Sequence, residues 1–367
     1  MQHSLSVLIK PVSGQCNMKC RYCFYVDEMA HRDTAVFKAM DDKILEMVVR
    51  RSLLAVDHDI TFCFQGGEPT LAGASFFRKF LKLERQYGAA SGLTITHTLQ
   101  TNGLSLSEEL LDVFEEGNFL IGVSVDGTKA IHDSRRIDAG GQGTYDRVLK
   151  NLKKLDERGI PHNILCVVDN DIARRPQEVF KTLAPHFYLQ FIACLDPLVP
   201  DSDNTALAPD LYGEFLIEIY RLYAHAIRSG KPVSIRTFDD WLGMLMGHPP
   251  GSCGLLGHCT PYILIESNGN VYPCDFYALD EWCLGNIVDT TVPRILRSER
   301  MMRFLRESHD IPEACPQCEY YMICRGGCRR DRDRSGALGA NRLCAAYKRF
   351  FKACLQDMKK LCGEIIT

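Results

Sequence analysis

The sequence predicts an α/β protein in which a partial (β/α)6 barrel, similar to an incomplete TIM barrel, precedes a second, cysteine-rich domain. Short β-rich runs alternate with amphipathic helical patterns over roughly the first 230 residues. Distinctive polar motifs directly follow most of the strand candidates. Near Ser234 the alternation stops and the composition changes, so we expect a domain boundary there.

The predicted strands are runs of apolar and β-branched residues bounded by polar or glycine-containing turns. They cover residues 5–9, 60–64, 93–99, 120–125, 163–168 and 188–193. Helical patterns lie between them. In residues 145–159, four apolar residues fall on one helical face and Gly159 is the expected C-terminal cap: Val148, Leu149, Leu152 and Leu155.

Six βα units form either an open doubly wound sheet or a partial barrel, and periodicity does not separate the two. The polar motifs favour the barrel, because catalytic loops converge at the carboxyl ends of barrel strands. In an open sheet they would gather mainly at one switch point. The motifs are "SGQCNMKCRYC", "QGGEPT", "QTNG", "SVDG" and "CLDP".

The second domain contains a predicted hairpin in "YILIESNGNVYPC", which turns at Asn268 and Gly269. The tail from Ala345 is expected to form a closing helix. We therefore predict a barrel over residues 1–233, a cysteine-rich domain over 234–345 and a C-terminal helix over 346–367.

Charge and composition exclude some classes of function. The 43 basic residues nearly balance the 46 acidic ones, which gives no global field for nucleic acid or an anionic membrane. No stretch approaches the ~18 apolar residues that a membrane span requires. The 17 cysteines are odd in number and no signal peptide is apparent, so metal ligation is favoured over disulfides. We expect a cytoplasmic protein with no membrane or nucleic-acid partner.

The first cysteine set is Cys16, Cys20 and Cys23, spaced C-x3-C-x2-C directly after the first strand. Three thiolates on one loop can hold three irons of a 4Fe-4S cluster, which leaves the fourth iron open to another ligand. The alternatives are a zinc site that lacks a ligand and chance clustering; the loop has no histidine to complete a zinc site.

The second set contains eight cysteines, enough for two fully ligated 4Fe-4S clusters. Zinc ribbons also use C-x2-C pairs, so zinc remains an alternative on spacing alone. The set is Cys253, Cys259, Cys274, Cys315, Cys318, Cys324, Cys328 and Cys344. The other cysteines are interpreted as buried small hydrophobic residues: Cys63, Cys166, Cys194, Cys283, Cys354 and Cys362.

The cysteine loop, with Tyr22 before its last cysteine and "GGEP" at residues 66–69, resembles that of the radical S-adenosylmethionine (SAM) enzymes. The resemblance implies that the open iron binds S-adenosylmethionine, which one electron cleaves to a 5'-deoxyadenosyl radical. It also implies a set of cofactor contacts: Tyr22, Gly67, Ser124, Arg136 and Leu195. Arg135 is an equal alternative to Arg136.

The second cysteine set is similar to the SPASM extension of radical enzymes that modify peptides. That resemblance alone implies the pairing of ligands. One auxiliary cluster would use Cys253, Cys259, Cys274 and Cys328. The other would use Cys315, Cys318, Cys324 and Cys344.

Longer strings resemble the anaerobic sulfatase-maturating enzymes over nearly the whole chain. They include "CRYCFY", "FQGGEPTLAG", "LQTNG", "HNILCVVDN", "LQFIACLDPL", "SIRTFD" and "VYPCDFY". The resemblance implies oxidation of a cysteine or serine of a sulfatase polypeptide to Cα-formylglycine. It also implies three 4Fe-4S clusters and a reductant such as flavodoxin or ferredoxin.

After loss of a hydrogen atom from the target Cβ, formation of C=S or C=O requires loss of one proton and one electron. Asp275 is the predicted proton acceptor, because its neighbour Cys274 is a predicted cluster ligand and the family places its acceptor here. Tyr25 corresponds to a family tyrosine near the substrate. The alternatives are a solvated acid for Asp275 and a packing ring for Tyr25.

Two other functions stay open. One is a different SPASM peptide maturase that forms thioether or carbon crosslinks; many such enzymes carry a leader-peptide domain, whereas here the first strand begins about five residues into the sequence. The other is a zinc-bearing scaffold without catalysis.

Overall fold

The computed structural model describes residues 2–89, 92–199, 206–334 and 337–366. The chain divides into two compact units, each described here by itself. The first unit comprises residues 1–124, 133–162 and 261–304. The second comprises residues 125–132, 163–260 and 305–367.

The first unit is built on a parallel sheet in which β1 pairs with β3, β3 with β4 and β4 with β5. These strands are β1 (Gln2–Ile9), β3 (Val56–Phe64), β4 (Thr94–Thr101) and β5 (Leu120–Ser124). The strands are parallel, so their carboxyl ends share one edge of the sheet, and the loops after β1, β3 and β4 lie together there.

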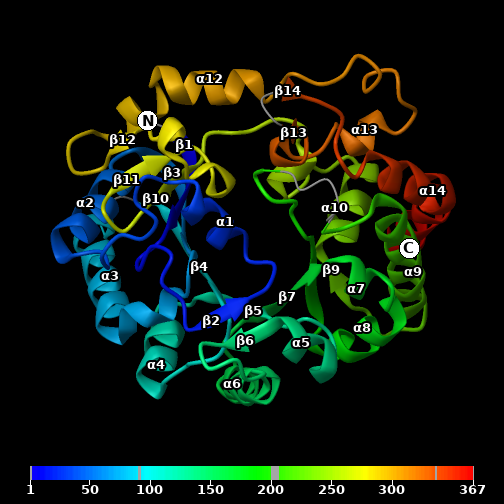
Figure 1. The fold of residues 1–367 in the computed structure, drawn as a ribbon, viewed down its shortest axis with the longest axis horizontal. Helices are drawn as coiled ribbons and strands as arrows, with labels where there is room; N and C mark the ends of the chain where they lie inside the picture. The colour runs from blue at the N-terminus through cyan, green and yellow to red at the C-terminus, as the bar shows by residue number, and fades with distance from the viewer. Residues whose placement is uncertain (1, 90–91, 200–205, 335–336, 367) are drawn as a thin grey trace. The chain divides into compact units, whose positions relative to one another are not determined.

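Helices α2 (Asp42–Leu53), α3 (Gly73–Gly88) and α4 (Glu108–Glu116) lie along one side of these strands (Figure 1). Their apolar faces pack on an aromatic core. The Phe64 ring lies 5.2 Å from that of Phe77 and 4.9 Å from that of Phe80, both with edge-to-face geometry. These buried rings anchor the strand that carries the "QGGEP" loop at its end.

A hairpin extends the sheet beyond β1. Its strands are β10 (Ile263–Ile265) and β11 (Asn270–Tyr272), and β12 (Gly285–Asn286) pairs next to β11. The predicted turn is confirmed: Gly269 has φ of 87°, which favours glycine. β10 pairs in parallel with β1, with Val7 opposite Ile263. The segment after β11, which contains Asp275, therefore belongs to the first unit.

Two short elements shape the cysteine loop. Strand β2 (Met18–Cys20) pairs antiparallel with β6 (Arg136–Asp138), which places Cys20 opposite Arg136. Helix α1 (Phe24–Ala30) begins directly after Cys23. The sequence analysis predicted neither element.

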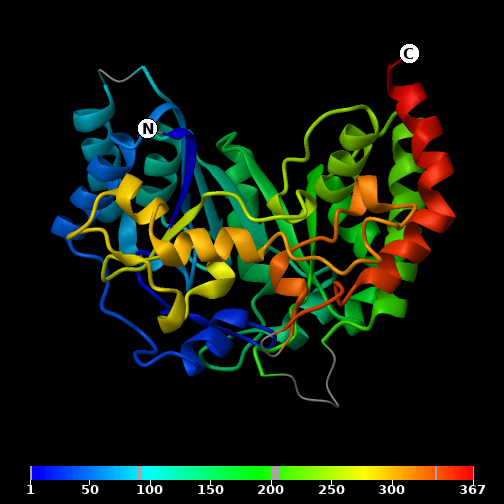
Figure 2. The ribbon, with the colours of Figure 1, turned by 90° about the horizontal axis from the view of Figure 1, so that it is seen from above.

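The second unit contains the parallel strands β7 (His162–Val168), β8 (Tyr188–Ala193) and β9 (Ser234–Ile235). Its longest helices, α9 (Pro209–Arg228) and α14 (Cys344–Ile366), lie side by side (Figure 2). Helices α7 (Asn170–Ala173), α8 (Pro176–Leu183) and α10 (Arg236–Leu245) pack nearby. The cysteine-bearing part has short elements: η3 (Cys253–Leu255), α13 (Tyr321–Cys324) and η6 (Arg329–Asp331).

The α/β fold class with a large parallel sheet is confirmed, and each predicted strand is present. β8 has the predicted bounds, whereas β3 begins at Val56, ahead of the predicted start at residue 60. The closing helix is confirmed from Cys344 to Ile366; Thr367 lies outside the described residues. The domain bounds stay a prediction. Among the helices that the structure describes, none has the length and apolar character needed to cross a membrane.

Candidate active site and cluster-binding cysteines

The first cysteine set lies on the loop after β1, at the carboxyl edge of the first unit's sheet. Partial desolvation of the Cys16 thiol, on a residue that still has an exposed surface, raises its pKa to about 11, and the charges of Glu68, Cys20 and Cys23 contribute to that rise. The free Cys16 thiol is therefore neutral near pH 7, and a bound iron would favour its thiolate form.

Polar groups surround the sulfur atoms. The backbone N–H of Met18 donates to Cys16 Sγ at 3.4 Å, and Asn102 Nδ2 donates to the same atom at 3.6 Å. Arg136 Nη1 lies 3.8 Å from Cys20 Sγ as a further donor. Such donors stabilise thiolates, so this donor set fits a 4Fe-4S cluster. Asn102 lies in the "QTNG" motif, but the motif alone does not predict its contact with Cys16.

Gly67 lets the "GGEP" loop approach the cysteine loop. Its φ is 56°, and a Cβ built there would lie 2.2 Å from the carbonyl oxygen of Gln15 and 2.9 Å from that of Ser13. No side chain fits into this gap without moving the backbone. The structure thus gives Gly67 a packing role, while its contact with S-adenosylmethionine stays a prediction.

Glu68 ties two strand-end loops together. Its buried carboxylate accepts hydrogen bonds from the backbone N–H and the hydroxyl of Thr70, at 3.0 and 2.6 Å. It also accepts bonds from the Thr101 hydroxyl at 2.8 Å and the Asn102 N–H at 2.7 Å. Asn102, which donates to Cys16, is therefore held by the loop that carries Gly67.

The other predicted cofactor contacts lie in both units. Ser124 ends β5, and Arg136 begins β6. The guanidinium carbons of Arg135 and Arg136 lie 5.5 and 5.3 Å from the centre of the Tyr22 ring, so these two contacts do not separate the alternatives. Leu195 follows β8 in the second unit.

The predicted catalytic residues, Asp275 and Tyr25, are in direct contact. The Tyr25 hydroxyl donates to Asp275 Oδ2 at 2.8 Å. Gln65 Nε2 donates to the same carboxylate oxygen at 3.0 Å and to the Tyr25 hydroxyl at 2.7 Å. Asp275 Oδ1 is buried and has no hydrogen-bond partner among the described residues. One oxygen is thus fixed by two donors while the other stays available.

The environment of Asp275 adjusts its acidity. Burial raises the pKa of its carboxyl group to about 6, while the charge of Lys10 and the hydrogen bond from Tyr25 oppose that rise. A carboxylate with this pKa is mostly ionised at neutral pH and holds a proton more readily than an exposed aspartate. This is a property expected of a general base.

A buried ion cluster lies beside this pair. The Lys10 ammonium, with none of the residue's surface exposed, is 3.0 Å from Glu266 Oε1 and 4.6 Å from the centre of the Tyr25 ring. Arg32 donates to Glu266 Oε1 from both terminal nitrogens, at 2.8 and 2.9 Å. Burial alone would raise the pKa of Glu266, but Lys10 and Arg32 together lower it. These three buried side chains therefore carry fixed charges next to the candidate base.

Glu28 adds a second buried carboxyl group near Asp275. Burial raises its pKa to about 8, Lys10 opposes the rise and Asp275 adds to it. The charge of Arg32 and a hydrogen bond from the Ala278 backbone also oppose the rise. Glu28 is thus neutral near pH 7. Four of these residues are not predicted from the sequence: Gln65, Lys10, Glu266 and Glu28. Of them, only Gln65 has a local signal, because it lies in "FQGGEP" at the end of β3.

In the second unit, four cysteines influence one another electrostatically. Among the described residues, no three His, Cys, Asp or Glu side chains are grouped closely enough to hold a metal ion in this conformation. Burial raises the pKa of the Cys324 thiol to about 11. Three neighbouring thiols add to that rise: Cys344, Cys315 and Cys318. These are the residues that the resemblance grouped as one cluster site, and their assignment as ligands stays a prediction.

Three further predicted ligands in this unit influence one another electrostatically. Burial raises the pKa of the Cys328 thiol well above its ordinary value, and Cys253 and Cys259 add to the rise. The backbone N–H of Arg330 donates to Cys328 Sγ at 3.4 Å. Cys274, the fourth residue of the predicted set, is in the first unit.

The remaining cysteines agree largely with their predicted role as hydrophobic residues. Four are buried: Cys166, Cys194, Cys354 and Cys362. Cys63 and Cys283 are partly buried and pack against an apolar cluster that includes Leu8 and Leu264.

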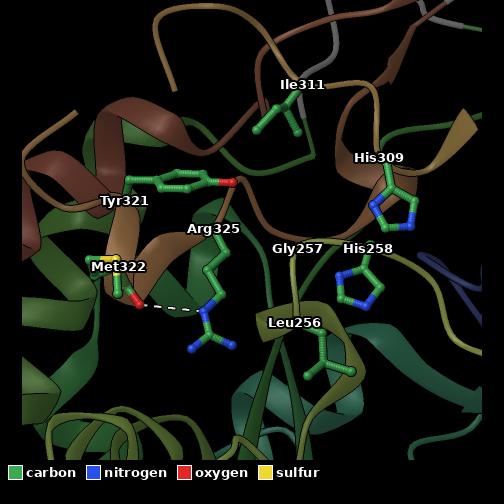
Figure 3. A pocket seen from close by; sticks show the side chains of 8 residues that line it. All are labelled: Leu256, Gly257, His258, His309, Ile311, Tyr321, Met322 and Arg325. Atoms are coloured by element: carbon green, nitrogen blue, oxygen red, sulfur yellow. Dashed lines mark hydrogen bonds between the residues drawn. The ribbon is translucent and has the colours of Figure 1, made fainter. Parts of the chain in front are cut away.

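A pocket of about 280 Å³ opens in the cysteine-bearing part of the second unit. Figure 3 shows Tyr321 and Arg325 on one side and the stacked rings of His258 and His309, 4.8 Å apart, on the other. Its lining, over the residues that the structure describes, includes none of the predicted catalytic or S-adenosylmethionine contacts.

Comparison with protein families gives two matches. Residues 11–182 match the radical SAM superfamily. Residues 259–319 match an iron-sulfur cluster-binding domain, SPASM. The first match covers the cysteine loop and the "GGEP" loop, and the second covers Asp275.

Individual relatives match nearly the whole chain. A cysteine-type anaerobic sulfatase-maturating enzyme of Clostridium novyi is 39% identical over 95% of this chain and 95% of its own. A serine-type anaerobic sulfatase-maturating enzyme of Klebsiella pneumoniae is 32% identical over 98% of this chain and 89% of its own.

A solved structure extends the likeness to three dimensions. The enzyme anSMEcpe, with bound AdoMet and a Cp18Cys peptide, matches with a TM-score of 0.93 and 38% identity, over 99% of both chains. The identities to these relatives and to this structure are between 32% and 39%, and each extends over at least 95% of this chain. The chain therefore belongs to the anaerobic sulfatase-maturating enzymes of the radical SAM superfamily.

Proposed function

We propose that this protein oxidises a cysteine or serine side chain of a sulfatase polypeptide to Cα-formylglycine. One observation carries the proposal. Asp275 is a buried carboxylate with one oxygen fixed by Tyr25 and Gln65 and the other available to accept a proton. Oxidation of a thiol or alcohol requires such an acceptor.

The chain's own residues would act in three ways. Asp275 Oδ1 would take the proton from the substrate thiol or hydroxyl. Tyr25 and Gln65 would hold the carboxylate in one orientation through Oδ2. Lys10 and Glu266, both fully buried, would keep a fixed charge environment around the pair.

The implied cofactors are S-adenosylmethionine and three 4Fe-4S clusters. When bound, they supply a 5'-deoxyadenosyl radical that removes a hydrogen atom from the substrate Cβ, and they accept the second electron. Cys16, Cys20 and Cys23 would hold the radical-generating cluster. The remaining predicted ligands would hold the auxiliary clusters: Cys253, Cys259, Cys274, Cys315, Cys318, Cys324, Cys328 and Cys344.

Cysteine is the favoured target residue, because the relatives named cysteine-type are more similar to this chain than those named serine-type. The peptide in the matched structure, named Cp18Cys, is in line with that choice. A reductant such as flavodoxin or ferredoxin would supply the electron, and a cytoplasmic location would suit oxygen-sensitive clusters.

Anaerobic incubation with a short sulfatase-motif peptide tests the function. Cysteine, serine and alanine versions are compared by mass spectrometry. We expect the mass change of thiol-to-aldehyde conversion with the cysteine peptide and no change with the alanine peptide. An unchanged cysteine peptide, with 5'-deoxyadenosine still produced, would reject the proposal.

The same assay separates the alternatives. A peptide that loses hydrogen and gains a crosslink instead of an aldehyde would indicate the other type of SPASM maturase. Streptococcus suis SuiB, solved with the precursor peptide SuiA bound, matches with a TM-score of 0.66 at 14% identity, which concerns the fold alone. A colourless protein that contains zinc rather than about twelve irons would indicate the scaffold.

A further inference from the structure

A basic pocket of about 580 Å³ lies in the first unit. Its lining includes two exposed arginines, Arg294 and Arg297, and three residues that bear hydroxyl groups, Thr290, Thr291 and Ser298. They lie on or next to the short helix α11 (Val292–Leu296). Among the described residues that line the pocket, none bears a carboxylate. The pocket therefore presents positive charge and hydrogen-bond donors.

The charge of this segment differs from that of the whole chain. Residues 284–304 contain four arginines and two acidic residues, whereas the chain has a net charge of -3. Within the described part of the chain, neither Arg294 nor Arg297 is paired with a carboxylate, whereas Arg300 donates to the Cys283 carbonyl oxygen. A guanidinium group binds carboxylates in a bidentate manner. The charges of Arg294 and Arg297 are therefore available to an external anion.

Contacts on two sides fix the pocket to the segment that carries the candidate base. The N–H of Leu284, which lines the pocket, donates to a carbonyl oxygen of β11 at 2.8 Å, and β11 leads to Asp275. After the pocket, helix α12 (Glu299–Glu307) places the Phe304 ring 5.0 Å from that of Tyr277, two residues beyond Asp275. A ligand bound in the pocket would thus lie on the same folded segment as Asp275.

The exposure of the arginines favours a polypeptide over a small anion. An exposed ion pair contributes little on its own, so a single phosphate or acetate would be held weakly. A polypeptide with several carboxylates would contact both arginines at once. If the same polypeptide also occupied the active site, the second contact would form at a high effective concentration. The nearly balanced charge of the chain gives no wider field that would favour nucleic acid.

We propose that Arg294 and Arg297 form a docking site for an acidic segment of the substrate polypeptide, separate from the side chain that is oxidised. The inference rests on the proposed function, which supplies the polypeptide, and adds a preference for clustered aspartate or glutamate. The hydroxyl groups of Thr290, Thr291 and Ser298 would donate further hydrogen bonds to the carboxylates. Loss of these contacts would raise KM for acidic substrates.

The test uses the iron-loaded enzyme and peptides that carry the cysteine motif next to a short run of aspartate, asparagine or lysine. One series carries the run before the motif and a second series carries it after the motif. The dissociation constant is measured by fluorescence anisotropy without a reductant, and KM by mass spectrometry of the aldehyde. The double variant Arg294→Gln and Arg297→Gln is compared with Arg50→Gln and Arg78→Gln. This control removes two exposed arginines of α2 and α3 in the same unit, so the change in net charge is equal.

We expect the aspartate peptide of at least one series to bind the wild type roughly three- to tenfold more tightly than the asparagine peptide. High salt should weaken that preference. The double variant should lose the preference, in both the dissociation constant and KM, and the control should keep it. Arg294→Glu with Arg297→Glu should transfer the preference to the lysine peptide, a gain that a misfolded protein could not show.

Equal affinity of the wild type for the aspartate and asparagine peptides in both series would overturn the proposal. A preference that persists in the double glutamine variant would overturn it as well. Tighter binding of inorganic phosphate or of an oligonucleotide than of the aspartate peptide, lost in the same variant, would assign the pocket to a phosphate ligand and reject the acidic polypeptide. An aspartate preference in a protein that forms no aldehyde would support the docking site and refute the proposed function.

Discussion

The Tyr25 hydroxyl donates a 2.8 Å hydrogen bond to Asp275, a residue 250 positions away in the sequence. Parallel pairing of β10 with β1 produces this contact, because it places the segment after β11 in the same unit as the helix that follows Cys23. The candidate base is therefore held by the segment that also carries the first cysteine set.

Tyr25→Phe removes the donor but keeps the ring beside Lys10. Because the lost hydrogen bond involves a charged acceptor, we expect formylglycine formation to slow roughly ten- to a hundredfold. Cleavage of S-adenosylmethionine should continue. The measurement compares the rates of aldehyde and 5'-deoxyadenosine formation in the same reaction. Tyr87→Phe is the matched control, since that partly buried hydroxyl, remote from the candidate site in sequence, also donates to a carboxylate, Glu46, at 2.6 Å. Equal aldehyde rates in the two variants would contradict the role of Tyr25.

Gly67→Ala should displace the cysteine loop, because the new Cβ would meet the Gln15 carbonyl oxygen. We expect a loss of about a third of the bound iron, corresponding to one cluster of three. Gly73→Ala is the control: Gly73 also has a positive φ, 77°, but a Cβ there meets no atom within 4 Å. Iron analysis of both purified variants is the measurement. Full iron content in Gly67→Ala would show that the loop tolerates the side chain.

Glu28→Gln should change how stability depends on pH. The folded-state pKa of Glu28 is raised to about 8 from an ordinary value of 4.5, so its contribution to stability is complete below pH 4.5 and is lost as the pH rises toward 8. Glutamine stays neutral throughout. The melting temperature of the variant relative to the wild type should therefore increase between pH 6 and pH 9, by about 5 °C. The measurement is a series of anaerobic thermal melts of both proteins across this pH range. Parallel plots of melting temperature against pH would show that the pKa of Glu28 is not raised in the folded protein.

Glu266→Gln should destabilise the first unit strongly, because it leaves Lys10 and Arg32 buried without a counter-charge. We expect a loss of about 3–5 kcal/mol in the free energy of unfolding. Glu108→Gln serves as a control, since it breaks exposed ion pairs with Lys154 and Arg158 and should cost less than about 1 kcal/mol. Denaturant unfolding of both variants measures the difference. Similar losses would mean that the buried charges are better hydrated than the structure indicates.

The sequence predicted what depends on local pattern. The run at residues 188–193 is β8 because it is apolar and bounded by turns, and Gly269 forms its turn because glycine accepts a positive φ. Parallel pairing of β10 with β1 was not predicted, because strand partners far apart in the chain leave no local signal. The burial of Lys10 and Glu28 was missed for the same reason: nothing in the sequence distinguishes them from exposed charges.

The proton acceptor is the central claim, and Asp275→Asn tests it most directly. Asparagine keeps the shape and can still accept the hydrogen bond from Tyr25, but it removes the charge. The measurement is the rate of formylglycine formation from the cysteine peptide, with iron content and 5'-deoxyadenosine production followed in parallel. We expect full iron content, continued 5'-deoxyadenosine production and at least a hundredfold slower aldehyde formation, on the order of the effect of a general base. A near-normal rate of aldehyde formation would contradict the assignment of Asp275 as the base.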